Sequence, residues 1–444
     1  MSNSRMVRFT NPKKALEEMN SNCTLQKVTF DYDKKPSLCA PGLSHVQGYA
    51  RYRGNDYDFH IFSHSDLHGS QGYLYIASEE QKNGKSKYSF TLKVPAKQIR
   101  HKDVATNASS TYNPHFNHPC GLQIVGDYLL VPVIPFHSAN SKFYDSAVVY
   151  LYDLTSLKGV TPKPPSPVIP KEPPLTKFKE VMLKVSKVSG GSLSCAGITD
   201  LKDGRFAIGL VADNNLDVYF TSNAPSDLSD AVWETSPVRK YSLKAGSGKN
   251  HYQGAGFLLD ENEDVYMIGF DTRGGSSKDD MADMYKLTYN NKWLDNQQLK
   301  PIYEKHLIGT GGARFTYAGG IEVRNFQDGK TVELIAIYST EANYTSGGIR
   351  INYWAYGGWS YVVSPYENTG KGNRYCINMN PNRPKKGVLH REMHKDTCGH
   401  LPKSYNRFWL GIYLSPQEAI HAAREHLESA VDGCYYCCNE IDTM

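Results

Sequence analysis

The chain has 444 residues, and its 50 Lys and Arg against 45 Asp and Glu give a formal net charge of +5. This length exceeds one ordinary small domain, and so weak a charge favours neither nucleic acid nor an anionic membrane as a partner. No run of about 18 apolar residues is present, so we expect no membrane span. The polar N-terminus lacks the apolar core of a signal peptide, and the nine cysteines are odd in number. Together these features favour a reducing, cytoplasmic location.

In chain order, residues 1–24 are expected to be a tail, and LQKVTFDY at 25–32 is expected to be a strand. Five repeats with one pattern follow, each with a glycine, a polar turn and strands rich in Val, Ile, Tyr and Phe. The opening glycines are Gly48, Gly121, Gly197, Gly256 and Gly320. The strands directly after the turns are predicted at 58–64, 128–133, 205–211, 265–270 and 333–339.

Each repeat continues with a third strand, and the first four repeats also have a fourth. The third strands are predicted at 72–78, 147–153, 216–222, 282–288 and 348–354, and the fourth strands at 88–94, 178–185, 239–245 and 301–307. The fifth repeat lacks a fourth strand, whereas 25–32 belongs to no repeat. If 25–32 supplies the outer strand of the blade that contains Gly320, a radial array closes without an unpaired edge.

The repeat therefore predicts an all-β fold, a five-bladed β-propeller over residues 25–360 with closure by the N-terminal strand. An open β-solenoid or two β-sandwiches are the alternatives, but sandwich strands do not repeat in groups of four behind the same glycine. The runs NHPCGLQIVGDYLLVPV at 117–133 and SCAGITDLKDGRFAIG at 194–209 resemble those of uncharacterised five-bladed propeller proteins of bacteria and fungi. That resemblance implies the fold and no particular activity.

A polar or aromatic side chain stands three residues before each opening glycine, near the expected start of the innermost strand. These residues are His45, His118, Ser194, Gln253 and Tyr317, and His251 lies close by. Around an axial channel they would form a ring able to hold a ligand or an ion. The alternative is that they bond neighbouring blade backbones and fill the mouth of the channel.

The sequence leaves two hypotheses for the function of the propeller. It contains no G-x-S-x-G, P-loop or G-x-G-x-x-G motif. The favoured hypothesis is a recognition module that binds an unidentified ligand or protein on the axial face. The alternative is a hydrolase that acts on a glycan through two carboxylates in the axial pocket. Acidic pairs such as Asp279 and Asp280 exist, but spacing alone does not place two of them in one pocket.

The pattern changes at a linker, residues 361–373, and residues 374–444 are predicted to form a small α+β module. One helix is clear, because Ser415 is a cap, Pro416 occupies the first turn and Glu418 completes a capping box. We expect this module to have a core separate from that of the propeller. A module of about 70 residues has little core of its own, so a bound metal would stabilise it.

Two spaced pairs predict the metal site. His394 and Cys398 form H-x3-C, and Cys434 and Cys437 form C-x2-C. Three thiolates and one imidazole make the closed tetrahedral set that is typical of a structural zinc ion. No position is then left for a catalytic water.

The module resembles the zinc-binding part of Ada-type DNA repair proteins. The shared features are a short hairpin, H-x3-C, an aromatic strand, a helix that begins Pro-x-Glu-Ala, and a final C-x2-C. In this sequence they are His394, Cys398, Trp409, Pro416 to Ala419, and Cys434 to Cys437. The resemblance implies a structural zinc ion. The module departs from the pattern in carrying Cys438, His390 and His400, any of which could replace a named ligand.

Overall fold

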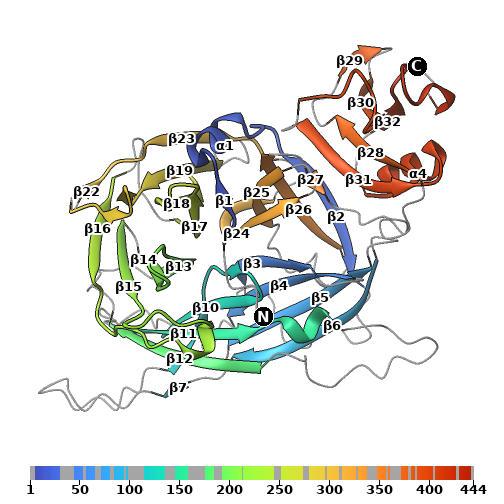
Figure 1. Cartoon of the computed structure of the whole chain (residues 1–444). Helices are drawn as coiled ribbons and strands as arrows, with labels where there is room; N and C mark the ends of the chain where they lie inside the picture. Colours follow the sequence, from blue (N-terminus) through green and yellow to red (C-terminus); the bar gives the residue numbers. More distant parts are fainter. Residues whose placement is uncertain are drawn as a thin grey trace, which may run out of the picture.

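A computed structural model describes most of the repeats and of the C-terminal module. The described residues are 6–30, 45–53, 57–65, 72–80, 85–94, 97–98, 115–135, 146–158, 176–184, 193–212, 214–244, 252–273, 280–295, 298–309, 313–326, 329–337, 348–356, 359–360, 372–378, 382–385, 388–403, 406–426 and 430–441. Their strands form a β-propeller, in which sheets surround a central axis and the C-terminal module lies at the rim (Figure 1).

The first two repeats form antiparallel groups in chain order. The first contains β3 (His45–Arg53), β4 (Tyr57–Ser65), β5 (Gly72–Glu80) and β6 (Lys85–Val94). The second contains β8 (His115–Pro119), β9 (Gln123–Val125), β10 (Tyr128–Pro135), β11 (Ser146–Asp153) and β12 (Thr176–Lys184), with the short β7 (Lys97–Gln98) beside β8 and α2 (Thr155–Lys158) after β11.

The third and fourth repeats follow the same order. The third contains β13 (Leu193–Asp200), β14 (Phe206–Ala212), β15 (Asn215–Phe220) and β16 (Arg239–Leu243), with η1 (Leu228–Asp230) before β16 and β22 (Gln298–Leu299) parallel to it. The fourth contains β17 (Gly254–Asp260), β18 (Val265–Thr272), β19 (Asp280–Lys286) and β23 (Tyr303–Leu307), with the small hairpin β20 (Thr288–Tyr289) and β21 (Lys292–Trp293) after β19.

The last group is completed by the start of the chain. It contains β24 (Arg314–Phe326), β25 (Gly329–Ile337), β26 (Gly348–Tyr356) and β2 (Thr24–Phe30). β2 pairs antiparallel with β26, from Thr24 opposite Tyr353 to Thr29 opposite Gly348. The predicted pairing of the N-terminal strand with the sheet that contains Gly320 is thus confirmed for residues 25–29. Phe30 pairs with Ser86 of β6, and residues 31 and 32 lie outside the described part.

Close approach of neighbouring innermost strands explains the repeated glycines. A Cβ atom on Gly48 would lie 2.7 Å from the Cα of Gly121 and 2.8 Å from the carbonyl oxygen of Cys120. A Cβ on Gly320 would meet the carbonyl group of Tyr49. Glycine is the residue that permits such an approach between two backbones. The opening glycine of a repeat therefore sets the distance between one innermost strand and the next.

Gln123 fills the space between innermost strands of three groups. Its side chain is 1% exposed. Its Oε1 accepts hydrogen bonds from the backbone N–H groups of Ile198 (2.9 Å) and Phe257 (3.1 Å), and its Nε2 donates to the carbonyl of Phe257 (3.2 Å). A buried amide with this many partners is well satisfied and fixes the strands relative to one another. The axis at this level is consequently packed with protein.

A buried ion-pair cluster joins the first and last groups. Arg51 of β3 has a side chain that is 1% exposed, and its Nε donates to Glu322 Oε2 of β24 at 2.6 Å. Its Nη2 also contacts Glu333 of β25, and its guanidinium lies 5.5 Å from the ring centre of Tyr353. Removal of one partner would leave a buried charge uncompensated, which is strongly destabilising.

The segment expected to be a tail is part of the fold. β1 (Arg8–Phe9) pairs parallel with the end of β17, and α1 (Pro12–Glu18) follows it. Arg8 Nη2 binds Asp200 Oδ2 at 2.6 Å and Glu263 Oε2 at 3.0 Å. Because Asp200 ends β13 and Glu263 lies between β17 and β18, this arginine links the third and fourth groups.

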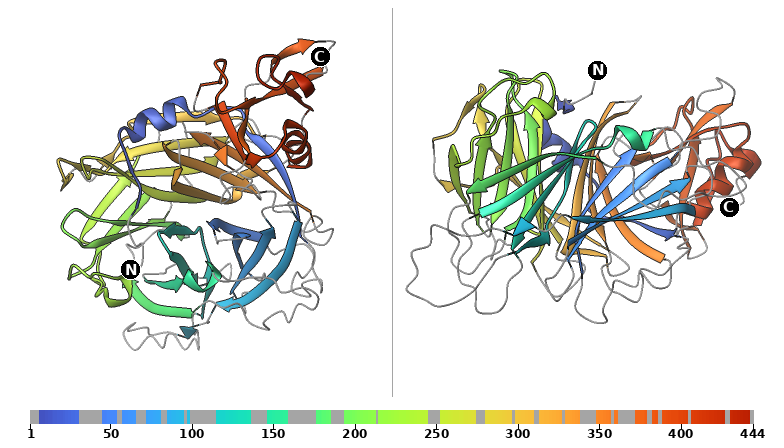
Figure 2. Two further views of the ribbon diagram at one scale, coloured as in Figure 1. Left: turned by 45° about the vertical axis from the view of Figure 1, so that its right-hand side comes forward. Right: turned by 90° about the horizontal axis from the view of Figure 1, so that it is seen from below.

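The C-terminal module packs on the propeller and shares a hydrophobic core with it (Figure 2). Its sheet contains β27 (Trp359–Ser360), β31 (Arg407–Tyr413), β28 (Asn373–Asn378), β30 (Val388–Lys395), β29 (Asn382–Lys385) and β32 (Ala430–Gly433), with α4 (Pro416–His426) and η3 (Asn439–Ile441). One apolar cluster includes Ile351 and Tyr353 of the propeller and Tyr375 and Met393 of the module. The expectation of two separate cores is therefore wrong.

The predicted helix cap is confirmed. The N–H of Glu418 donates to Ser415 Oγ at 3.3 Å, and Glu418 Oε2 accepts from the N–H of Leu414 at 3.2 Å. Ile420 and Ala423 are buried, as the helical spacing predicts. The predicted propeller boundary at residue 360 includes Trp359 and Ser360. These two residues instead form β27, which pairs with β31 of the module.

We predict that Gly48→Ala lowers the free energy of unfolding by about 2–3 kcal/mol, because backbone atoms of the neighbouring strand cannot move aside as a side chain can. Urea unfolding of the intact chain measures the change. Gly399→Ala is the control, since nothing lies within 4 Å of its added Cβ, and its effect should stay below about 0.5 kcal/mol. Equal losses in the two variants would contradict the role assigned to the close approach.

Candidate functional site

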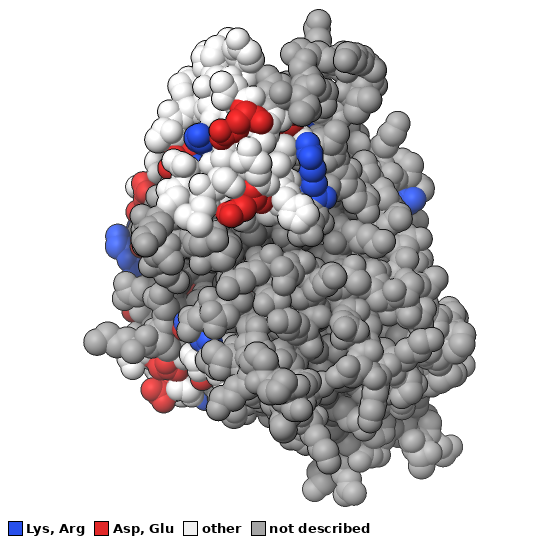
Figure 3. Space-filling view, turned by 90° about the vertical axis from the view of Figure 1, so that its right-hand side faces the viewer, with Lys and Arg blue, Asp and Glu red and all other residues white. Residues whose placement is uncertain are grey.

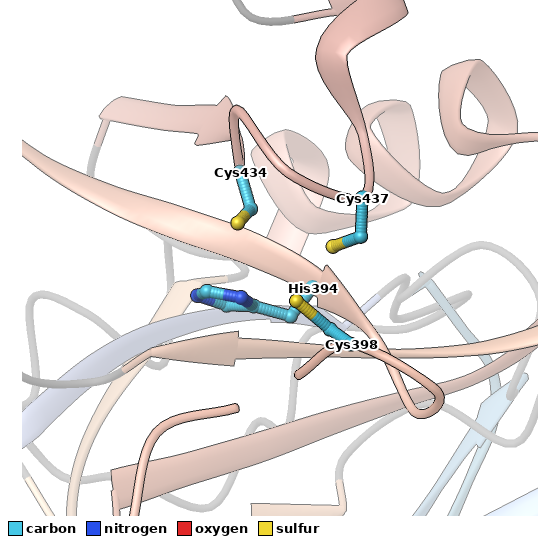
Figure 4. A group of neighbouring side chains, drawn as sticks. All are labelled: His394, Cys398, Cys434 and Cys437. Atoms are coloured by element: carbon cyan, nitrogen blue, oxygen red, sulfur yellow. The ribbon is translucent and has the colours of Figure 1, made fainter. Parts of the chain in front are cut away.

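The four side chains predicted to bind a metal lie together in the C-terminal module (Figure 4). One ligand atom from each of His394, Cys398, Cys434 and Cys437 lies within 4.8 Å of the others. β30 carries His394, and the turn after it carries Cys398. β32 ends directly before Cys434. Because β30 and β32 are parallel neighbours, with Met393 opposite Gly433, the two turns leave the sheet side by side.

Backbone hydrogen bonds shape both turns around the sulfur atoms. The carbonyl of Cys434 accepts from the N–H groups of Cys437 (3.2 Å) and Cys438 (2.8 Å). The N–H of Lys395 donates to Cys437 Sγ at 3.3 Å, and the N–H of His400 donates to Cys398 Sγ at 3.4 Å. An N–H donor stabilises a thiolate more than a thiol. The turns are thus suited to sulfur in its metal-binding form.

The electrostatics of the cluster fit a cation. His394 is 2% exposed, and neither of its ring nitrogens has a hydrogen-bond partner. Burial lowers the pKa of His394, which favours the neutral imidazole that binds metals. Burial raises the pKa of Cys398, and raises the pKa of Cys434 to about 12. A divalent cation would satisfy the imidazole and replace the protons on sulfur.

None of the three possible substitutes belongs to this group of four, although Cys438 adjoins it. Cys438 is fully buried in the apolar cluster, with its Sγ 3.8 Å from that of Cys437. His390 is a buried residue of β30, and the exposed ring of His400 stacks on Tyr436. Among the described residues, the His and Cys side chains that lie close enough to share one metal ion include none of the three.

The residues predicted around the axial channel are only partly described. The side chains of His118 and Gln253 lie half-buried near the start of innermost strands. His45 opens β3, and Ser194 and Tyr317 lie in β13 and β24, but the side chains of these three lie outside the described part, as does all of His251. The described residues therefore do not test whether these side chains form a ring around the axis.

A second polar cluster was missed by sequence reasoning. It lies at the end of β18 and the start of β19 and contains Asp271, Arg273, Asp280, Asp283 and Tyr252. Arg273 Nε binds Asp271 Oδ1 at 3.2 Å, and its Nη2 contacts Asp283. Tyr252 donates a hydrogen bond to Asp283 Oδ2 at 2.5 Å. Of these residues, only Asp280 stands out in the sequence, where it forms an acidic pair with Asp279.

Burial changes the protonation of these carboxyl groups. Desolvation raises the pKa of Asp271 to about 7 and that of Asp280 to about 7. Asp280 Oδ1 accepts from Thr272 Oγ1 at 2.5 Å, whereas Asp280 Oδ2 and Asp283 Oδ1 are buried without a hydrogen-bond partner. Burial also raises the pKa of Asp283, although Tyr252 and Arg273 oppose that shift. The cluster therefore contains three desolvated carboxyl groups, of which Asp271 and Asp283 share Arg273.

Comparisons with known proteins leave the family open. No family model matches the chain, and no curated protein matches it. Among solved structures, an α-L-arabinanase of Cellvibrio cellulosa in complex with arabinohexaose is 12% identical over 70% of this chain and 92% of its own, with a TM-score of 0.33. A glycosyl hydrolase of Bacteroides ovatus is 9% identical over 80% and 93%, with a TM-score of 0.40.

A hypothetical protein of Leishmania major is 12% identical over 76% of this chain and 89% of its own, with a TM-score of 0.34. With TM-scores of 0.40 or lower, these likenesses assign no activity to this chain. In the described residues, no helix combines the length and the hydropathy that a membrane span requires.

We predict that the thermal stability of the chain falls as pH rises from about 5 to about 8, to an extent set partly by Asp271 and Asp280. The pKa of an Asp in an unfolded chain is about 3.9. Between that pH and about 7, Asp271 and Asp280 therefore bind more protons in the folded chain than in the unfolded chain. Folding is then favoured at the acidic end of this window.

The measurement is the midpoint of thermal unfolding across this pH window in wild type and in an Asp271→Asn, Asp280→Asn variant. The variant should show a flatter dependence. Asp295→Asn, whose side chain is 93% exposed, is the control and should follow wild type. A double variant with the wild-type slope would contradict the prediction.

Proposed function

We propose that the C-terminal module binds one structural zinc ion through His394, Cys398, Cys434 and Cys437. The observation that carries this proposal is the buried His394 beside three sulfur atoms within 4.8 Å. Its two ring nitrogens have no hydrogen-bond partner, and Glu392 Oε2 lies 3.7 Å from Nε2. Zinc prefers this donor set, and four protein ligands close the tetrahedron. The ion would hold the turns after β30 and before η3 together.

Metal analysis of the chain purified without chelators should find one zinc ion per molecule, and Cys434→Ser should lose it. Zinc in such modules contributes about 10–16 kcal/mol at neutral pH, so the variant should also unfold at a lower temperature. Because the module and the propeller share an apolar cluster, part of the propeller should be destabilised with it. A metal-free wild type would overturn the zinc proposal.

Cys438→Ser is the matched control for the choice of sulfur. It removes a neighbouring thiol that lies outside the group of four ligands, so zinc content should remain that of wild type, while the new buried hydroxyl lowers stability by about 1–3 kcal/mol. Loss of zinc in Cys438→Ser and its retention in Cys437→Ser would identify Cys438 as the ligand.

We infer that the propeller has five blades, one for each repeat. The pairing of β2 with β26, together with the antiparallel groups that follow each opening glycine, supports this count. The proposed boundaries are 25–360 for the propeller and 374–444 for the zinc module, amended by the short strand β27 that joins the sheet of the module.

For the propeller we propose, as a second candidate function, the hydrolysis of a glycan at the carboxylates of Asp271, Asp280 and Asp283. Glycoside hydrolysis needs one carboxyl group that is protonated near neutral pH and one that is ionised. Burial raises the pKa of Asp280 to about 7, so this group could donate a proton near neutral pH, and Arg273 partly offsets the effect of burial on Asp283. This cluster of carboxyl groups supports the hydrolase over a purely recognising propeller.

Release of reducing ends from a panel of polysaccharides tests this function. Asp280→Asn should slow the release by at least about 100-fold, which is typical of a lost general acid, whereas Asp295→Asn should not change it. Hydrolysis that persists in Asp280→Asn, or none with any polysaccharide, would overturn the proposal. A glycan that is bound by wild type and not cleaved would restore the recognition hypothesis.

A further inference from the structure

The C-x2-C turn presents two exposed tyrosines. Tyr435 is 70% exposed and Tyr436 is 67% exposed, although Cys434 beside them is 2% exposed. Their rings lie 5.4 Å apart at 86°, and the ring of Tyr436 stacks on His400 at 3.9 Å and 21°. We call Tyr435, Tyr436 and His400 the aromatic platform. Single exposed apolar residues are common, whereas these adjacent rings together expose apolar faces and polar hydroxyl groups.

The platform is held by the turns of the metal centre. His400 donates its backbone N–H to Cys398 Sγ at 3.4 Å. The carbonyl of Cys434 accepts from the N–H groups of Cys437 and Cys438, which closes the turn that carries Tyr436. A ring from each turn is therefore fixed by the same ligands that hold the metal. Such a surface is rigid before a ligand arrives, which reduces the entropy lost on binding.

The size of the platform argues against a protein partner. A tyrosine side chain contributes about 150–250 Å² to an interface. At the observed exposures of 70% and 67%, the two rings offer about 200–340 Å² in all. A specific protein interface buries about 800 Å² on each partner. The platform matches a small, flat ligand.

The charge around the platform argues against nucleic acid. Residues 374–444 contain nine Lys and Arg and eight Asp and Glu. Figure 3 shows charges of both signs over the described part of the molecule on the side where the module lies. A surface that stacks bases of single-stranded nucleic acid is lined by positive charge that tracks the phosphates. The module has no such excess.

We propose that the aromatic platform binds a sugar ring of a glycan. The apolar C–H face of the sugar would lie on one of the two tyrosine rings, with the other ring, at 86° to it, beside the sugar. The hydroxyl groups of the sugar would hydrogen-bond with the tyrosine hydroxyls. A tyrosine supplies an apolar face and a polar handle at low conformational cost. This proposal rests on the proposed zinc site, which holds the turns, and is independent of the proposed hydrolysis by the propeller.

Retention of the intact, zinc-loaded chain on insoluble cellulose, chitin, xylan and arabinan tests the platform. Wild type should be retained on at least one of them. Tyr436→Ala should weaken that binding at least about tenfold, which corresponds to about 1.4 kcal/mol, and Tyr435→Ala should weaken it also. Tyr436→Phe should keep most of the affinity, because the ring face remains.

Tyr289→Ala is the matched control, because this tyrosine is 62% exposed in the β20–β21 hairpin of the propeller. Its binding should equal that of wild type. Zinc content and the unfolding midpoint of Tyr436→Ala should also be unchanged, which separates a lost contact from a lost fold. Retention of Tyr436→Ala at wild-type affinity would overturn the proposal.

Two further outcomes would also overturn the platform as a sugar site. One is that none of the four polysaccharides retains wild type. The other is that a single-stranded oligothymidylate retains it instead, with an affinity that falls steeply as salt rises. A wild-type chain that contains no zinc and still binds a glycan through Tyr436 would overturn the zinc proposal alone.

Discussion

The close approach of the innermost strands is the constraint on which the propeller depends. At Gly48 and Gly320 the neighbouring backbone lies where a Cβ atom would be, so no other residue type fits without movement of a strand. Gln123 then binds innermost strands of two further groups. Because the described Gln123 side chain fills the space between these strands, we expect a ligand of the propeller to bind at a mouth or between strand groups.

The same constraint explains why the fold was predictable from the sequence. A glycine that opens each repeat leaves a recurring signal, and strand alternation and turn residues act over a few positions. The cluster of four side chains was predictable for a similar reason, since His394 with Cys398 and Cys434 with Cys437 are two local pairs. The capped helix at Ser415 is also local. Each of these features is encoded by residues close together in the chain.

The features that the sequence did not reveal depend on contacts between distant segments. Arg8 is a member of the fold because of Asp200 and Glu263, which lie far along the chain. The shared core of the module and the propeller arises from side chains whose apolar character fits either core. Asp271 and Asp283 meet through the pairing of β18 with β19, and strand alternation alone does not indicate that an arginine stands between them. Exposure of Tyr435 and Tyr436 follows from the turn geometry, which spacing does not specify.

The position of β2 has a consequence for synthesis. The outer strand of the last group is made first, and its partner β26 leaves the ribosome only after almost the whole propeller has been translated. Until then β2 lacks the partner that covers this edge, and unpaired strand edges are sites where chains pair wrongly with one another. Ring closure is a contact between segments far apart in the chain, and such contacts form slowly. Newly made chains should therefore depend on chaperones during this interval, and two chains that exchange β2 would form a domain-swapped dimer with all the native strand pairs.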